Sequence, residues 1–225
     1  MKLIVKICGL STEETLDAAL AAGADMVGLV FFPKSPRFLD LARATELAAR
    51  AAGRAEIVAL TVDMDDIGIA AIVDAVEPDW LQLHGRETPE RVAAIGQQFD
   101  RRTIKALHVS EAADLKAADA YVEAADQLLL DAKPPKGALL PGGNGAAFDW
   151  TILRGFDPGI PYLLSGGLDA DNVGEAIRIS GAPGVDVSSG VETAPGKKSP
   201  ELIRRFIAAA RSAEHPAAPK ERIAS

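Results

Sequence analysis

The feature that most constrains the fold is an alternation of eight short apolar runs with longer stretches of helical spacing. The runs are rich in Val, Ile and Leu, and most are followed by an Ala-rich segment. Repeated strand–helix units of this kind predict a parallel sheet. Eight units within 225 residues, with no linker-like run between them, favour a closed (β/α)8 TIM barrel over an open doubly wound sheet.

The expected elements follow the apolar runs and the helix-end signals. We predict strands at 2–7, 26–31, 56–62, 80–83, 103–107, 127–130, 162–164 and 185–187. The clearest helices are predicted at 12–22, 40–52, 65–76, 89–95, 172–179 and 200–213, with weaker helical patterns at 110–125 and 148–153. Residues 1–213 are therefore expected to form one barrel domain. Residues 214–225 contain two prolines and mixed charges, and we expect a disordered tail.

Composition excludes several classes of partner. With 24 Lys and Arg against 32 Asp and Glu, the net charge of −8 repels a nucleic-acid backbone. No apolar stretch approaches the roughly 18 residues that cross a bilayer. One cysteine cannot form an internal disulfide, which favours a reduced cytoplasmic setting. We expect no nucleic-acid or membrane partner, and a monomer or a homodimer.

Strand parity selects the side chains that line the barrel. Successive residues of a strand point to opposite faces, and a lysine is not expected beneath a helix, so we place the face of Lys6 and Cys8 inward. The same reasoning predicts the following inward residues: Ile4, Gln82, His84, Lys105, Gln127, Leu129, Asp131, Asp186 and Ser188. Polar side chains thus collect at the carboxyl ends of the strands, where barrel enzymes build their sites.

The residues alone leave ordinary structural roles open. A buried Cys8 is compatible with simple packing, and Asp131 with a turn or a helix cap. His84 is compatible with a hydrogen-bonded wall residue, and Lys6 and Lys105 with balancing carboxylates in the barrel interior.

Glycine-rich segments after the late strands suggest a phosphate site. They are PGGNG at 141–145, SGGL at 165–168 and SSGVE at 188–192. Glycine lets backbone N–H groups approach an anion, and the last two loops of a barrel often bind phosphate, although each loop alone could be an ordinary turn. The candidate ligands are Gly166, Gly167, Ser188, Ser189 and Gly190. A second anion site is suggested by the proline-stiffened segment 31–38, which carries Lys34 and Arg37.

Seven motifs in order along the chain resemble one family. They are KICGL at 6–10, VGLVFFPKSPR at 27–37, LQLHG at 81–85, LLLD at 128–131, GGNGAAFDW at 142–150, SGGLDADNV at 165–173 and VDVSSGVE at 185–192. Together they are similar to phosphoribosylanthranilate isomerase of tryptophan biosynthesis. One departure is the loop after the sixth strand, which reads GGNGAA here and usually reads GGTGK or GGSGK in the family.

The resemblance implies a reaction and roles for individual residues. The reaction is an Amadori rearrangement of a phosphoribosyl substrate, without metal or organic cofactor. Cys8 matches the general base and Asp131 the general acid, Arg37 the residue that holds the anthranilate carboxylate, and the glycine–serine loops the phosphate site. Further substrate-binding candidates are Lys6, His84 and Asp186.

The acid and the base need opposite environments. A free thiol has a pKa near ~8.5, so a thiolate at Cys8 requires a pKa lowered by about 1.5 units, or roughly 2 kcal/mol, which Lys6 could supply. The acid at Asp131 must hold its proton near neutrality, which burial favours.

Two competing interpretations are distinguished by Cys8 and Asp131. The related sugar-phosphate isomerase of histidine biosynthesis typically has Asp in place of Cys8 and an internal repeat with two phosphate sites, neither of which this sequence shows. A barrel that only binds a sugar phosphate or a partner protein would not need both groups.

Overall fold

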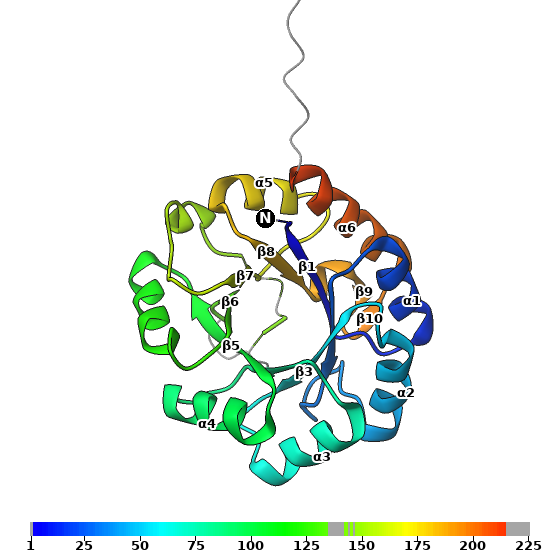
Figure 1. The fold of residues 1–225 in the computed structure, drawn as a ribbon. Coiled ribbons are helices and arrows are strands. Elements are labelled where there is room, and N and C mark those ends of the chain that lie inside the picture. Colours follow the sequence, from blue (N-terminus) through cyan, green and yellow to red (C-terminus); the bar gives the residue numbers. More distant parts are fainter. Residues whose placement is uncertain (1, 135–141, 144, 146, 215–225) are drawn as a thin grey trace, which may run out of the picture.

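Eight parallel strands close into a barrel in chain order in the computed structural model, which describes residues 2–134, 142–143, 145 and 147–214 (Figure 1). Each strand pairs with its sequence neighbours, and β8 closes the barrel on β1. The predicted TIM barrel is confirmed. The strands are β1 (Ile4–Cys8), β2 (Met26–Val30), β3 (Glu56–Thr61), β4 (Trp80–Leu83), β5 (Arg102–Val109), β6 (Gln127–Ala132), β7 (Tyr162–Leu164) and β8 (Gly184–Val187).

Helices surround the barrel on its outside (Figure 1). The α-helices are α1 (Glu13–Ala22), α2 (Leu41–Ala51), α3 (Asp66–Val76), α4 (Pro89–Phe99), α5 (Val173–Ser180) and α6 (Pro200–Glu214). The 3₁₀ helices in the described part of the chain are η1 (Ala112–Tyr121), η2 (Trp150–Leu153) and η3 (Ser189–Val191). A small antiparallel pair, β9 (Glu192–Ala194) with β10 (Lys197–Lys198), follows η3.

Local capping explains where the helices begin and end. The side chains of Thr12, Asp40, Asp65 and Thr88 each accept a hydrogen bond from a backbone N–H in the first turn of their helix. Helix α4 runs one turn beyond the predicted end, because Asp100 rather than an earlier residue takes the left-handed capping conformation. The weakly predicted helices after β5 and β6 are 3₁₀ helices, which agrees with their weaker helical patterns.

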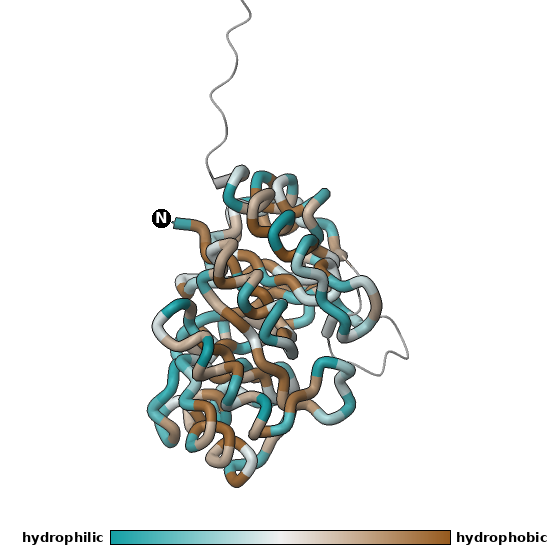
Figure 2. Tube along the Cα trace, turned by 90° about the vertical axis from the view of Figure 1, so that its right-hand side faces the viewer, coloured by the Kyte–Doolittle hydropathy of each residue, from teal (hydrophilic) through white to brown (hydrophobic). Residues whose placement is uncertain are grey.

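The core has two layers, one inside the barrel and one between the strands and the helices. The inner layer contains Met26, Val58, Trp80, Ile104, Ala106, Leu129 and Leu163, with Ile4 packed against it. The larger outer layer joins the other face of the strands to the helices. Hydrophilic residues gather on the outer turns and loops (Figure 2). The inner layer fills the barrel, so a ligand can enter only at its end.

The inward placement of Lys105 is wrong. Its neighbours Ile104 and Ala106 belong to the inner layer, and Lys105 therefore points outward. There its Nζ donates to the carboxylate of Glu87 at 2.7 Å and to the carbonyls of Leu83 and Gly85. The prediction assumed that a lysine does not lie beneath a helix. Here a nearby carboxylate and two carbonyls stabilise the charge of Lys105 in that position.

Two expectations concern segments that the structure describes only in part. Helix α6 extends to Glu214, and residues 215–225 of the expected tail lie outside the described residues. In the loop after β6, residues 135–141, 144 and 146 also lie outside them. Within the described parts of the chain, no helix has the length and apolar character needed to span a bilayer.

Candidate active site

A cavity opens at the carboxyl ends of the strands and gathers most of the predicted site residues. The residues predicted from the sequence that line this cavity are Cys8, Arg37, His84, Asp131, Gly166, Gly167, Asp186, Ser188 and Ser189. Lys6 and Gly190 are not in the lining. The cavity is also lined by Phe32, Ser35, Gln82, Gly142, Gly143 and Ser165, among others. The predicted residues in this lining come from six of the eight strands or their following loops and converge on one space.

Lys6 lies beneath the cavity and is fully buried. Its Nζ donates to Asp186 Oδ1 at 2.6 Å, and Ser165 Oγ donates to Asp186 Oδ2 at 3.1 Å. Burial opposes the charge on Lys6, but the Asp186 carboxylate and the nearby Cys8 raise the pKa of the lysine. The register pairs Lys6 with Asp186 on adjacent strands, so the barrel itself sets this ion pair.

Cys8 ends β1 and is only 3% exposed. Burial raises the pKa of its thiol above the ordinary value, and Lys6 only partly opposes this effect. The expectation that Lys6 makes Cys8 a thiolate is therefore wrong for the free protein. The main physical reason is burial of the thiol, and the Asp186 carboxylate paired with Lys6 further disfavours a second anion beside it.

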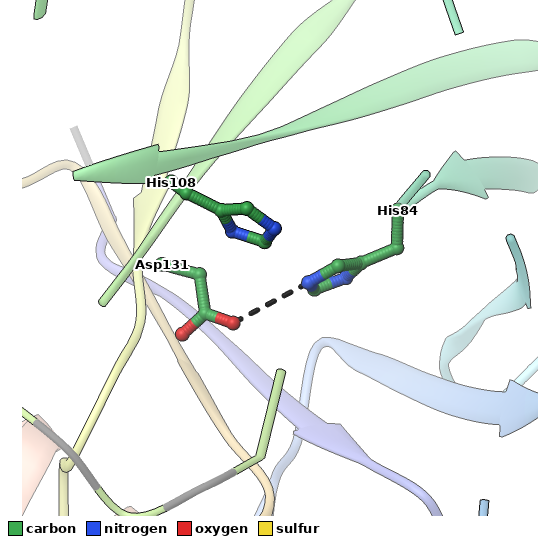
Figure 3. Close-up of side chains that lie close together, drawn as sticks. All are labelled: His84, His108 and Asp131. Atoms are coloured by element: carbon green, nitrogen blue, oxygen red, sulfur yellow. Dashed lines mark ion pairs between the residues drawn. The ribbon is translucent and has the colours of Figure 1, made fainter. Parts of the chain in front are cut away.

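Asp131 ends the apolar run of β6 and faces two histidines (Figure 3). His84 Nε2 lies 3.3 Å from Asp131 Oδ2, and Gln82 Nε2 lies 3.0 Å from His84 Nδ1. His108 of β5 was not predicted. Its ring centroid lies 5.7 Å from that of His84, and burial together with His84 lowers its pKa. The strand extends past the predicted end at Leu107, which brings His108 to the cavity end of the barrel.

Arg37 is held by partners that the sequence reasoning missed. Its Nε and Nη2 donate to the two oxygens of Glu192 at 2.7 and 2.8 Å. Burial opposes ionisation of Glu192, but Arg37 and Lys198 hold its pKa below the ordinary value. Lys198 Nζ contacts Glu192 and the hydroxyl and carbonyl oxygens of Ser188. Burial lowers the pKa of Lys198 to about 8.

The glycine loops after β7 and β8 require glycine for steric reasons. Gly166 has φ +88°, and a Cβ there would lie 2.5 Å from the backbone nitrogen of Ala132. A Cβ at Gly190 would lie 1.9 Å from the carbonyl oxygen of Leu168. Gly190 thus lets the two loops touch, whereas Gly166, Gly167, Ser188 and Ser189 line the cavity. Within the described residues, no hydrogen bond uses the backbone N–H groups of Gly166 and Gly167.

The fold and the site define a class of protein. It is a (β/α)8-barrel enzyme that collects a thiol, a carboxyl group, an arginine and two glycine loops at the carboxyl end of its strands. The family profile described as N-(5'-phosphoribosyl)anthranilate (PRA) isomerase matches residues 5–209. The chain belongs to this family.

Curated relatives and solved structures agree with this assignment. The chain is 60% identical over 214 residues to N-(5'-phosphoribosyl)anthranilate isomerase of Rhodopseudomonas palustris, covering 95% of this chain and 98% of the relative. It is 61% identical over 213 residues to the Afipia carboxidovorans enzyme, covering 95% and 91%. The Thermotoga maritima structure has a TM-score of 0.84 at 34% identity, covering 93% and 99%. A further structure, in complex with reduced 1-(o-carboxyphenylamino)-1-deoxyribulose 5-phosphate, has a TM-score of 0.82 at 33% identity, covering 93% and 99%.

Proposed function

We propose that this enzyme converts N-(5-phosphoribosyl)anthranilate to 1-(2-carboxyphenylamino)-1-deoxyribulose 5-phosphate in tryptophan biosynthesis, with Cys8 as general base and Asp131 as general acid. The observation that carries the proposal is that Cys8 and Asp131 line the same cavity. They come from β1 and β6, and the strands between them, β7 and β8, carry the glycine loops. One sugar phosphate bound to those loops would lie between the two groups.

The chemistry needs one proton donor and one proton acceptor. Asp131 gives a proton to the ring oxygen of the furanose, the bond between that oxygen and C1 breaks, and the anthranilate nitrogen forms a protonated Schiff base with C1. The thiolate of Cys8 then takes the proton from C2, and the electrons of that bond neutralise the nitrogen. The resulting enolamine tautomerises to the ketone: the hydroxyl on C2 loses its proton, the C2–O bond becomes a carbonyl, and C1 gains a proton. Atoms and electrons balance without a metal or an organic cofactor.

The substrate's two anionic ends have separate partners in this proposal. The phosphate lies against Gly166, Gly167, Ser188 and Ser189, whose backbone N–H groups supply donors without a basic surface. The anthranilate carboxylate lies against Arg37. Because Glu192 holds Nε and Nη2, the guanidinium is fixed in orientation and Nη1 remains for the substrate.

The remaining candidates position these groups. Lys6 has no exposed surface, so it acts on Cys8 through its charge rather than by touching the substrate. Asp186 fixes Lys6, and His84 contacts the Asp131 carboxyl. Because the thiol of the free protein is mostly neutral, the positive charge of the Schiff base favours its ionisation at the step that needs the base.

The test is the decrease in fluorescence of N-(5-phosphoribosyl)anthranilate on addition of the protein. Cys8→Ser and Asp131→Asn should each lower kcat by about 10²–10⁴-fold while substrate binding is retained. Near-normal turnover by either variant would remove that residue from the mechanism. The precursor used by the histidine-pathway isomerase is assayed in parallel, and turnover of that compound alone would refute the proposed substrate.

The cavity is built from residues of one chain, so we expect a monomer and a homodimer to be equally competent. One solved relative is described as monomers generated from the dimeric enzyme of Thermotoga maritima. Activity that disappears on dilution to the monomer would contradict this expectation.

A further inference from the structure

Three side chains of types that can bind a metal ion meet at the carboxyl ends of three adjacent strands (Figure 3). His84 follows β4, His108 lies in β5 and Asp131 lies in β6, where the register pairs it with His108. One nitrogen of each histidine and one oxygen of the carboxylate all lie within 4.8 Å of one another. The strands of a closed barrel fix these positions, so the cluster belongs to the rigid part of the fold.

We propose that His84, His108 and Asp131 form a binding site for a divalent ion of the Zn²⁺ type, and that an ion bound there inhibits the enzyme. A tetrahedral ion with bonds of about 2.1 Å keeps its ligand atoms about 3.4 Å apart. The distance of 3.3 Å between His84 Nε2 and Asp131 Oδ2 matches that separation. His108 is half-buried, and its nitrogen, now within 4.8 Å of the other two ligand atoms, would have to move to the same separation when the ion binds.

Buried polar atoms without hydrogen bonds provide an independent observation. Among the described residues, His84 Nε2, His108 Nδ1 and Gln82 Oε1 have no hydrogen-bond partner. His84 is only 6% exposed, and although its Nε2 lies within ion-pair distance of Asp131, the contact lacks hydrogen-bond geometry. Burying a polar atom without a hydrogen-bond partner destabilises the folded protein. A bound ion would satisfy the nitrogens of both histidines at once.

Gln82 can hydrogen-bond the second ring nitrogen of His84 while the first binds the ion. Metal binding through Nε2 of His84 requires a proton on Nδ1, whereas the present contact has Gln82 Nε2 facing Nδ1 at 3.0 Å. A half-turn of the Gln82 amide exchanges its nitrogen for Oε1, which would then accept the Nδ1 proton. Metal-bound histidines commonly donate their second ring N–H in this way.

The donor set indicates which ion binds and what it does. Two imidazoles and one carboxylate suit Zn²⁺ or Co²⁺ better than Mg²⁺ or Ca²⁺, which prefer oxygen ligands. Three protein ligands leave a fourth position open, as in many accessible zinc sites. Asp131 bound to a metal cannot carry the proton that ring opening needs, so the ion acts as an inhibitor and not as a cofactor. Metal binding is measured without substrate and does not depend on the proposed reaction.

The experiment titrates metal-free protein with Co²⁺ and follows its visible ligand-field absorption, with Zn²⁺ added to displace it. We expect the band in the wild-type protein and at least about tenfold weaker affinity in His108→Gln. Cys8→Ser is the matched control, because the thiol in the same cavity is the alternative ligand. Absence of the band, equal affinity in His108→Gln, or a sulfur-to-cobalt charge-transfer band that disappears in Cys8→Ser would each overturn the proposal.

Two further measurements keep the test decisive if His108→Gln does not fold. X-ray absorption of the Zn²⁺-loaded wild-type protein should show imidazole and oxygen neighbours, and a sulfur neighbour would refute the site. In the activity assay, Zn²⁺ should inhibit the wild type reversibly, with inhibition relieved by a chelator. The concentration for half inhibition should rise at least about tenfold in folded His108→Gln, and an unchanged value would refute the link between the cluster and inhibition.

Discussion

Replacement of Lys6 by Met should destabilise the barrel by about 3–5 kcal/mol, because it leaves Asp186 buried without its partner. The side chains of Lys6 and Asp186 are 0% and 6% exposed, and their charged atoms are 2.6 Å apart. At that distance and an effective dielectric constant of about 20, their attraction is about 6 kcal/mol, which offsets the cost of burying both charges. In Lys6→Met, among the residues that the structure describes, only the hydroxyl of Ser165 still hydrogen-bonds the carboxylate.

The assay is urea unfolding of the wild type, Lys6→Met, and the double variant Lys6→Met/Asp186→Leu. The double variant carries neither charge, so we expect it to recover most of the lost free energy of unfolding. It should nevertheless remain poorly active, because Cys8 has lost the cation that favours its thiolate. A single variant within about 1 kcal/mol of the wild type, or a double variant no more stable than the single one, would refute the reasoning.

Three further predictions follow from the other buried charges. Alkylation of Cys8 by iodoacetamide should rise with pH to a midpoint above the ~8.5 of a free thiol, and a rate already maximal at pH 7 would contradict the raised pKa. Lys105→Met should cost about 3 kcal/mol or more in urea unfolding yet leave kcat/KM within about twofold, whereas a large loss of kcat/KM would place Lys105 in the site. Burial opposes ionisation of Glu87, but Lys105 holds the pKa of this carboxyl below its ordinary value. The ionised Glu87 therefore stabilises the fold fully above the ordinary pKa near ~4.3, and this stabilisation is lost as the pH falls through the lower pKa of the folded state. In Glu87→Gln the free energy of unfolding should depend less steeply on pH in this acidic range, and an unchanged dependence would contradict the prediction.

The sequence predicted the parts of the site that depend on strand ends. Cys8 and Asp131 each close an apolar run, and in a parallel barrel the ends of such runs share one rim. Glycine-rich loops are visible in the same way, because the steric demand at Gly166 leaves a glycine in the sequence. The ends of apolar runs and the glycine-rich loops are both local features, so a single sequence is enough to find them.

The contacts around Arg37 could not be predicted, because they join distant segments. Glu192 lies 155 positions from Arg37 along the chain, and only closure of the barrel brings the two together. Glu192 does end the motif VDVSSGVE, and Lys198 follows six positions later. An acidic residue directly after a glycine loop was therefore the available signal, but nothing local identifies the cation with which it pairs.

The two buried lysines show why parity failed for β5 and succeeded for β1. Strands of a parallel barrel are buried on both faces, so their sequences do not alternate, and charge was the only guide to orientation. Lys6 faces the interior and Lys105 the helices, yet each is paired with a carboxylate from a neighbouring strand or its following loop, Asp186 or Glu87. A lysine in such a strand therefore predicts an acidic residue on an adjacent strand or just past its end, and says nothing about which face it occupies. The same uncertainty of face, together with a strand end placed at Leu107, concealed His108.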